Sequence, residues 1–226
     1  DLLAPFSDQL LPDTLSGYRF PITDGTERNR KNMRVAANLL EQAGYSVMDG
    51  ALVAADGEPV RFNILLRQGA QEYLSIVELY MDALSRLGIT VEVDLVDGAQ
   101  YAERRKSLDF DMTPFARSLS LSPGNEQRLY WGQEYADVEG TRNLMGVKSP
   151  ALDAMIDALN TAKSRQEFLD AVRAMDRVLT AGRYVIPIYH NGPSRIAHKS
   201  HLEFPKRTPI YGDRIGFFPD VWWSKQ

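Results

Sequence analysis

The alternation of strand and helix patterns over residues 60–115 most constrains how this chain can fold. Apolar residues alternate over residues 60–66, recur at helical spacing over 73–87, and alternate again over 89–95. A shorter helix is predicted around residues 101–108, and a third strand over 110–115. Strands separated by helices at this spacing favour a parallel sheet with covering helices. The fold class predicted from the residues is therefore α/β.

The rest of the chain suggests three regions. Residues 1–30 are rich in Pro, Asp, Ser and Thr without a sustained period, which predicts an extended entry segment. Residues 31–190 carry the helix and strand patterns and are predicted to form one α/β lobe. Residues 191–226 form a tail rich in proline and aromatic residues.

Local signals place three further helices and one strand. A helix that starts near Met33 is expected to end at Gly44, as a C-terminal cap requires. Ser149 is a good N-cap for a second helix, and Ser164 caps a third, with a glutamate three residues later. Residues 184–189 are apolar around a proline and predict a buried strand.

Composition excludes several classes of function. The chain has no cysteine, which rules out disulfides, Cys-ligated zinc and Cys nucleophiles. The net charge of -4 comes from acidic and basic residues spread along the chain, so no nucleic-acid partner is expected. The basic run Arg104–Lys106 is interpreted as a solvated helix face. No apolar run approaches the roughly 20 residues of a membrane span. The first residues lack a Met and a signal-peptide core, so the chain is expected to begin in mid-protein or after processing.

Motifs for cofactors and metals are missing from the sequence. Neither G-x-G-x-x-G after the first strand nor G-x-x-x-x-G-K-[ST] occurs, so no nucleotide cofactor is expected. His198 and His201 are three residues apart, but the flanking sequence is not helical, and no metal site is expected. Asp109 and Asp111 point the same way along a strand and could form an acid–base pair. Capping of nearby backbone, or solvation, is the favoured interpretation of both.

The segment 115–127 is the most distinctive candidate site. It follows the third predicted strand, where ligands of open α/β sheets usually bind, beyond the carboxyl ends of the strands. It offers a guanidinium, three hydroxyls, a flexible glycine, an amide and a carboxylate, which suit a polar or zwitterionic ligand. A solvated loop is the alternative. The predicted ligand contacts are Phe115, Arg117, Ser118, Ser122, Asn125, Glu126 and Asn143, with His190 as a weaker candidate.

Several motifs resemble a known family. Residues 38–45 resemble the "LLxxAGY" helix end of extracellular solute-binding proteins of family 5, which serve ABC importers of oligopeptides, dipeptides and nickel. Residues 87–89 and 109–112 look like the core motifs of that family. Further motifs resemble its Yej-type branch, linked to import of oligopeptides and peptide-like antibiotics such as microcin C. Those motifs are residues 122–127, 142–146 and 222–223.

The resemblance implies a fold and a function. Members fold as two lobes around a cleft, so this chain is expected to supply most of the second, C-terminal lobe, of the type II periplasmic binding-protein kind. The tail would pack on the first lobe, which this chain lacks. The implied function is capture of peptides or peptide-like compounds in the periplasm and delivery to a membrane ABC permease, without catalysis. The signal peptide would lie outside this chain.

One departure from the family and two rival functions stay open. Better-known peptide binders hold the amino terminus of the ligand with an Asp shortly after the third strand, whereas residues 117–120 contain none. Glu126 is the nearest acidic substitute. The first rival is a hydrolytic α/β enzyme domain that uses Asp109 or Asp111. The second is the ligand-sensing domain of a receptor or regulator.

Overall fold

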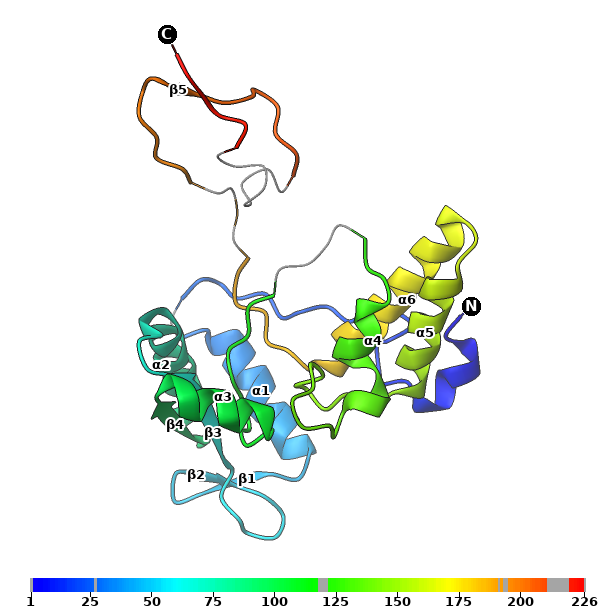
Figure 1. Ribbon diagram of the computed structural model, residues 1–226. Helices are drawn as coiled ribbons and strands as arrows, with labels where there is room; N and C mark the ends of the chain where they lie inside the picture. The colour runs from blue at the N-terminus through cyan, green and yellow to red at the C-terminus, as the bar shows by residue number, and fades with distance from the viewer. Residues whose placement is uncertain are drawn as a thin grey trace. The chain divides into compact units, whose positions relative to one another are not determined.

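Two compact units make up the chain, Asp1–Val185 and Ile186–Gln226. The computed structural model describes residues 2–26, 28–117, 122–190, 192, 195–210 and 220–225. Figure 1 shows the elements of both units. The first unit contains η1 (Ala4–Gln9), α1 (Arg30–Gln42), β1 (Ser46–Met48), β2 (Ala51–Val53), β3 (Arg61–Arg67), α2 (Gln71–Ser85), β4 (Thr90–Val96), α3 (Gly98–Lys106), α4 (Glu126–Trp131), η2 (Gln133–Tyr135), α5 (Pro150–Thr161) and α6 (Arg165–Gly182). The second contains β5 (Leu202–Glu203) and β6 (Trp223–Ser224).

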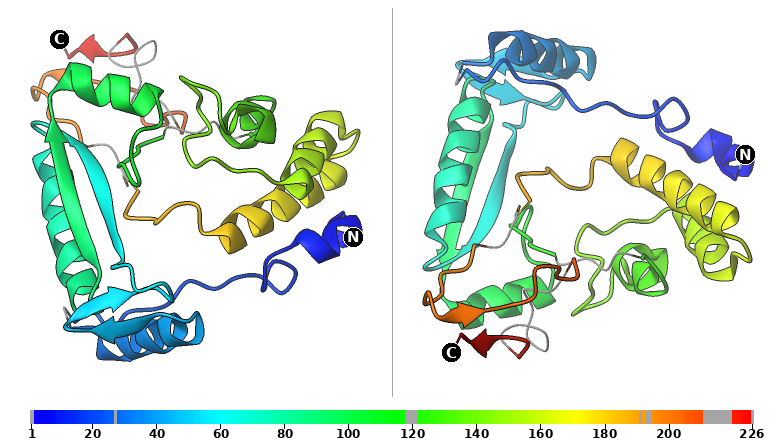
Figure 2. Two further views of the ribbon diagram at one scale, coloured as in Figure 1. Left: turned by 90° about the horizontal axis from the view of Figure 1, so that it is seen from below. Right: turned by 90° about the horizontal axis from the view of Figure 1, so that it is seen from above.

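The parallel pair β3–β4 forms the predicted βαβ core. The strands pair in register from Arg61 opposite Thr90 to Arg67 opposite Val96. The helix between them, α2, runs alongside the strands (Figure 2). Its apolar stripe packs on the sheet because residues three and four apart share a helix face. The buried residues of this core are Ile64, Leu66, Val77 and Val91. The predicted α/β fold class is confirmed.

The third predicted strand is reduced to one bridge, between Ile64 and Met112. Met112 donates its N–H to the carbonyl oxygen of Asn63 and accepts from the N–H of Leu65. The next ladder bond would come from the N–H of Pro114, which proline lacks. The hydroxyl of Thr113 donates instead to the carbonyl oxygen of Leu65 at 3.1 Å. The prediction of a full strand is wrong because one proline ends the ladder.

A helical hairpin, α5 and α6, forms the other core of the first unit. The predicted caps are confirmed: Ser149 Oγ accepts from the N–H of Leu152 at 3.3 Å, and Ser164 Oγ from the N–H of Glu167 at 3.2 Å. The entry segment is not wholly extended, because η1 forms there and packs on α5. The buried residues of this core are Leu3, Val147, Leu152, Met155, Ile156, Leu159, Ala171, Met175 and Val178.

The buried strand predicted over residues 184–189 does not form. Val185, Ile186, Ile188 and Tyr189 are each about half exposed, from 51% to 54%. A strand needs a neighbour to accept its backbone hydrogen bonds. No described strand pairs with this segment, so the prediction is wrong for this chain.

The second unit contains one short antiparallel pair and an aromatic cluster. Leu202 pairs with Ser224, and Glu203 with Trp223. The rings of Phe204 and Trp222 stack with centroids 5.0 Å apart, and His198 meets both rings edge-on. Within the described residues of the whole chain, no helix is both long and apolar enough to cross a membrane.

Candidate ligand-binding site

The chain leaves the edge of the sheet at the place where the sequence predicts a site. Met112 is the last residue on the ladder, and Phe115 and Arg117 follow it closely. β4 ends nearby at Val96, and Asp97 then caps α3 by accepting from two backbone N–H groups. The carboxyl ends of parallel strands share one edge of a sheet, which is the usual ligand edge of open α/β folds. The chain therefore leaves the sheet at the expected edge, and ligand binding there stays a prediction.

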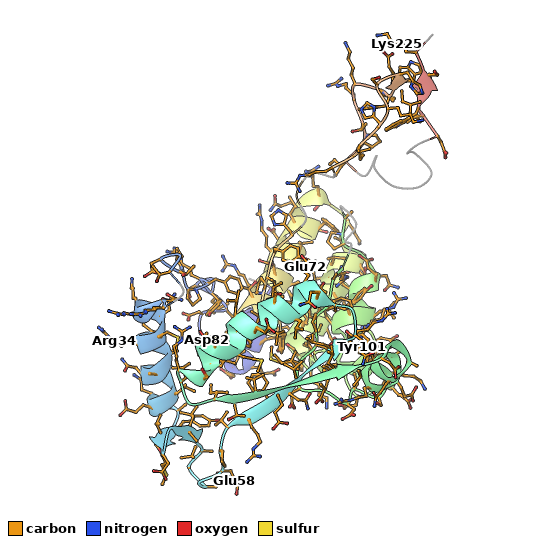
Figure 3. The ribbon with its side chains drawn as sticks, turned by 90° about the vertical axis from the view of Figure 1, so that its left-hand side faces the viewer. Arg34, Glu58, Glu72, Asp82, Tyr101 and Lys225 are labelled. Atoms are coloured by element: carbon orange, nitrogen blue, oxygen red, sulfur yellow. The ribbon has the colours of Figure 1, made fainter. Side chains whose placement is uncertain are left out.

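Phe115 belongs to a small group of aromatic and cationic side chains. The guanidinium carbon of Arg105 lies 5.7 Å from the ring centroids of both Phe115 and Tyr101. The Tyr101 hydroxyl (Figure 3) and Thr113 Oγ1 are 2.9 Å apart, which ties α3 to the end of the sheet. The Nε atom of Arg105 is buried and has no hydrogen-bond partner in the described part of the chain. Phe115 itself is 49% exposed and offers an apolar surface to a ligand.

The basic run at the end of α3 is only in part the solvated face that the sequence suggests. Arg104 bridges Asp94 and Asp109, with nitrogen–oxygen distances of 2.8 Å to each carboxylate. The hydrogen bond to Asp94 is the main cause that raises the pKa of Arg104. Lys106 pairs with Glu139 at 2.8 Å. Arg104 departs from the prediction because it joins β4 to the segment that follows α3, whereas Lys106 is exposed, as predicted.

Arg117 lies on the face of an aromatic ring. Its guanidinium carbon is 3.3 Å from the ring centroid of Tyr130 in α4, and that of Arg142 is 5.7 Å from the same ring. Burial lowers the pKa of Arg117, the charge of Arg142 adds to that shift, and Tyr130 and Glu126 oppose it. Arginine nevertheless stays protonated in proteins. The site therefore holds two guanidinium groups around one ring.

Glu126 supplies the opposite charge. Its Oε1 accepts from the backbone N–H of Gly124 at 3.0 Å and from the side-chain amide of Gln127 at 3.1 Å. Desolvation raises the pKa of Glu126, but hydrogen bonds to the carboxylate and the charge of Arg117 outweigh it, so the net shift is downward. Among the described residues, no ion pair joins Glu126 to Arg117 or to any other cation. A fixed anion and a fixed cation are thus held near each other without neutralising contact.

The remaining predicted contacts lie in different settings. Asn125 is exposed at the start of α4, and its Oδ1 accepts from Asn160 at 3.5 Å. Ser122 is also exposed on the same segment. Ser118 lies outside the described residues. His190 is exposed in the second unit. The structure therefore groups Ser122, Asn125 and Glu126 beside the start of α4 and leaves His190 as a separate prediction.

Asn143 lies in the interior of the fold, where its side chain binds backbone groups. It is fully buried, and its Nδ2 donates to the carbonyl oxygens of Gly132 and Val147, each at 3.0 Å. Its Oδ1 accepts from the backbone N–H of Val147, also at 3.0 Å. These bonds close the turn before α5. The position favours a structural role for Asn143 over the predicted ligand contact.

Tyr130, Arg142, Arg105 and Tyr101 were not predicted from the sequence as parts of this site. Their contacts come from tertiary packing and have no period along the chain. The one available signal was the motif of residues 142–146, in which Arg142 directly precedes Asn143.

Asp109 and Asp111, the candidate acid–base pair, each bind a neighbouring group of the fold. Asp111 Oδ2 accepts from the backbone N–H of Asn63 at 2.8 Å. Asp109 pairs with Arg104. Both contacts agree with the favoured interpretation, in which these carboxylates bind neighbouring groups of the fold. Within the described residues, no group of three or more His, Asp or Glu side chains is placed to hold a metal ion.

The chain is similar to several bacterial binding proteins over almost its whole length. It is 42% identical over 224 residues to a Brucella melitensis protein that carries a provisional name as a binding protein, covering 99% of this chain and 36% of the relative. Two Agrobacterium fabrum proteins are each 37% identical, covering 99% of this chain: the "Probable peptide-binding protein YejA", of which 36% is covered, and the "Peptidoglycan-binding protein YepA", of which 35% is covered. The chain thus spans about a third of the length of these relatives. The similarity to YejA confirms the predicted Yej-type branch.

Solved structures and a family model agree on the fold. The oligopeptide-binding protein AppA from Bacillus subtilis, solved with a nonapeptide, gives a TM-score of 0.65 at 17% identity and covers 100% of this chain and 45% of AppA. A periplasmic oligopeptide-binding protein from Thermotoga maritima gives a TM-score of 0.63 at 19% identity over 70% of this chain and 31% of that protein. The predicted binding-protein lobe is confirmed. The model for bacterial extracellular solute-binding proteins, family 5 middle region, matches residues 4–137. The chain therefore belongs to family 5 of the bacterial extracellular solute-binding proteins.

Proposed function

We propose that this chain is part of the periplasmic solute-binding component of an ABC importer and captures oligopeptides or peptide-like compounds. Its family and the names of its relatives support this class of function. The remainder of the complete protein would supply the first lobe and close on the ligand about a hinge, as two-lobed binding proteins do. A membrane ABC permease would then receive the ligand.

The observation that carries the proposal is the pair of unneutralised charges beyond the sheet. The guanidinium of Arg117 lies over the ring of Tyr130, with Arg142 near the same ring, and Glu126 is held ionised on the neighbouring segment. A peptide carries a carboxylate at one end and an amine at the other. A guanidinium binds a carboxylate with two parallel charge-assisted hydrogen bonds, and a carboxylate binds an amine. Phe115 adds an apolar surface for a side chain. Glu126 is then the proposed anchor for the amino terminus, in place of the absent Asp.

The test is to identify the ligand that the complete protein carries. We expect mass spectrometry of the purified full-length protein to find co-purifying peptides, and calorimetry with those compounds to show saturable binding. One relative is named as a peptidoglycan-binding protein, so cell-wall peptides belong in the panel beside linear oligopeptides. If the full-length protein binds no peptide of this panel, the proposal is contradicted.

A first prediction concerns the completeness of the binding site. Ligand sites bury about 70–90% or more of a drug-sized ligand, which one wall of a cleft cannot do. Residues 1–226 alone should therefore bind the identified ligand far more weakly than the full-length protein. Calorimetry on both proteins, with circular dichroism to verify that the shorter one folds, measures the difference. Equal, tight binding by a folded short chain would contradict the two-lobe model.

A second prediction concerns catalysis. We expect no turnover of peptides or esters, because Asp109 and Asp111 are engaged by Arg104 and by the backbone of Asn63. Asp109→Asn and Asp111→Asn should leave ligand affinity unchanged in the full-length protein. The measurement is product formation over long incubations with each variant beside the wild type. Hydrolysis that either substitution abolishes would replace the transport proposal with the hydrolase alternative.

A further inference from the structure

A second cluster of charge lies away from the residues of the candidate peptide site. A pocket of about 430 Å³ is lined by Arg28, by residues of α1 and by the two residues that follow α2. Its cationic lining is Arg28, Arg30, Arg34 and Arg86, and its apolar lining includes Met33 and Leu87. Figure 3 shows Arg34 on α1 and Asp82 on α2. Positions 30, 33, 34 and 37 of the pocket share one face of α1, because residues three and four apart are neighbours on a helix.

The positive charge of this arginine pocket is largely uncompensated. Arg86 pairs with Asp82 at 2.8 Å. In the described part of the chain, Arg28, Arg30 and Arg34 make no ion pair. No acidic residue lines the arginine pocket itself.

Another described carboxylate, that of Asp24, faces a different hollow. That adjoining hollow is lined by Asp24, Thr26, Arg28 and Arg30. Asp24 already accepts from the backbone N–H and the hydroxyl of Thr26, which lower its pKa. Glu27 lies outside the described residues. Three cations therefore stand together although like charges repel each other.

The start of α1 adds further donors to the same place. Asn29 has a φ of 35° and makes no side-chain cap, and no acidic residue occurs in the first turn. The first N–H groups of a helix lack internal partners and attract negative charge. Each of the other α-helices in the described part has a capping side chain or an acidic residue in its first turn. The start of α1 instead carries Arg30 and Lys31, which the helix dipole disfavours.

We propose that the arginine pocket binds a phosphate group. The guanidinium fork matches phosphate oxygens in bidentate geometry, and the free N–H groups of a helix start are common phosphate donors. A phosphate would neutralise the crowded arginines and complete the uncapped turn. The pocket also has apolar walls, Met33 and Leu87, which suit the carbon substituent of a phosphate ester or a lipid headgroup. The site shares no residue with the proposed peptide site and is independent of it.

The test uses the full-length protein with two probes. Inorganic phosphate is titrated by calorimetry in a low-salt chloride buffer, and sedimentation measures binding to phosphatidylcholine vesicles with and without phosphatidylglycerol. The double variant Arg30→Gln, Arg34→Gln should weaken binding by about tenfold or more, because two charge-assisted contacts are lost. Its melting temperature without phosphate should not fall, since the substitution relieves repulsion between cations. Added sodium chloride should weaken binding by the wild type through screening.

Arg165→Gln is the matched control, because Arg165 is also the first residue of a helix but that helix has a Ser164 cap. It should bind both probes as the wild type does. Loss of phosphate binding in the double variant supports a site for a soluble phosphate. Loss of binding to anionic vesicles alone supports a site for a lipid headgroup. Equal binding by the wild type and the double variant in both arms, or no binding by the wild type in either, overturns the proposal.

Discussion

Replacement of Arg117 by alanine is expected to weaken ligand binding by the full-length protein by about 1.5–3 kcal/mol, roughly 10- to 150-fold in Kd. This is the range for hydrogen bonds to charged groups. The guanidinium lies over the ring of Tyr130 and makes no ion pair in the described part of the chain, so it can still donate to a ligand carboxylate. Folding should change by about 0.5–2 kcal/mol, because the half-buried contact with Tyr130 lies between the exposed and desolvated limits for cation–π contacts. Calorimetry with the identified ligand and urea unfolding measure the two effects.

Arg128→Ala is a matched control, because Arg128 lies in α4, the short helix that also carries Tyr130. Arg128 pairs with Asp157 and lies near Glu134, so it stabilises the fold by the small amount typical of surface ion pairs, about 0–1 kcal/mol. Its loss should leave ligand affinity unchanged. If Arg117→Ala also leaves affinity unchanged while the protein remains folded, Arg117 is not a ligand contact. The segment after Met112 would then be an ordinary surface loop.

The sequence predicts where a candidate site lies, but not which side chains surround it. Arg117 and Glu126 stand out because they follow a predicted strand, at the edge where α/β sheets bind ligands. Tyr130 and Arg142 are distant in sequence from Arg117 and meet it only through packing. No periodic pattern marks such contacts. Asn143 shows a second difficulty, because a polar residue beside a motif can be buried and fully hydrogen-bonded.

The same difference between local and distant interactions explains which elements of the fold could be predicted. The caps at Ser149 and Ser164 form as predicted because a cap depends on a few adjacent residues. The third strand depends on one backbone donor, which Pro114 lacks and the hydroxyl of Thr113 replaces. The strand over 184–189 depends on a neighbouring strand that no described residue provides. Patterns in a sequence predict which residues prefer a strand, but not whether a partner is present.

Replacement of Asn143 by alanine is expected to have the largest effect on stability, about 3–5 kcal/mol of unfolding free energy. The substitution leaves the carbonyl oxygen of Gly132 and both backbone polar groups of Val147 without their partner. Each buried group left unsatisfied costs about 1–3 kcal/mol. Val147 is also fully buried in the core formed with α5 and α6, so water cannot easily replace the lost bonds. Urea unfolding of the full-length protein, followed by circular dichroism, measures the loss.

Asn160→Ala is the control for this substitution, because Asn160 is exposed and its side-chain contact is a long one, 3.5 Å to Asn125. It should change stability by no more than about 0.5 kcal/mol, as most surface substitutions do. Ligand affinity is compared at a temperature where the Asn143→Ala protein stays folded. Asn143→Ala should weaken ligand binding less than Arg117→Ala does, because the side-chain amide of Asn143 is buried in the interior. Unchanged stability together with lost affinity would reverse the assignment and return Asn143 to the ligand contacts. The two substitutions, Asn143→Ala and Arg117→Ala, therefore separate a residue that we expect to hold the loop in place from one that we expect to meet the ligand.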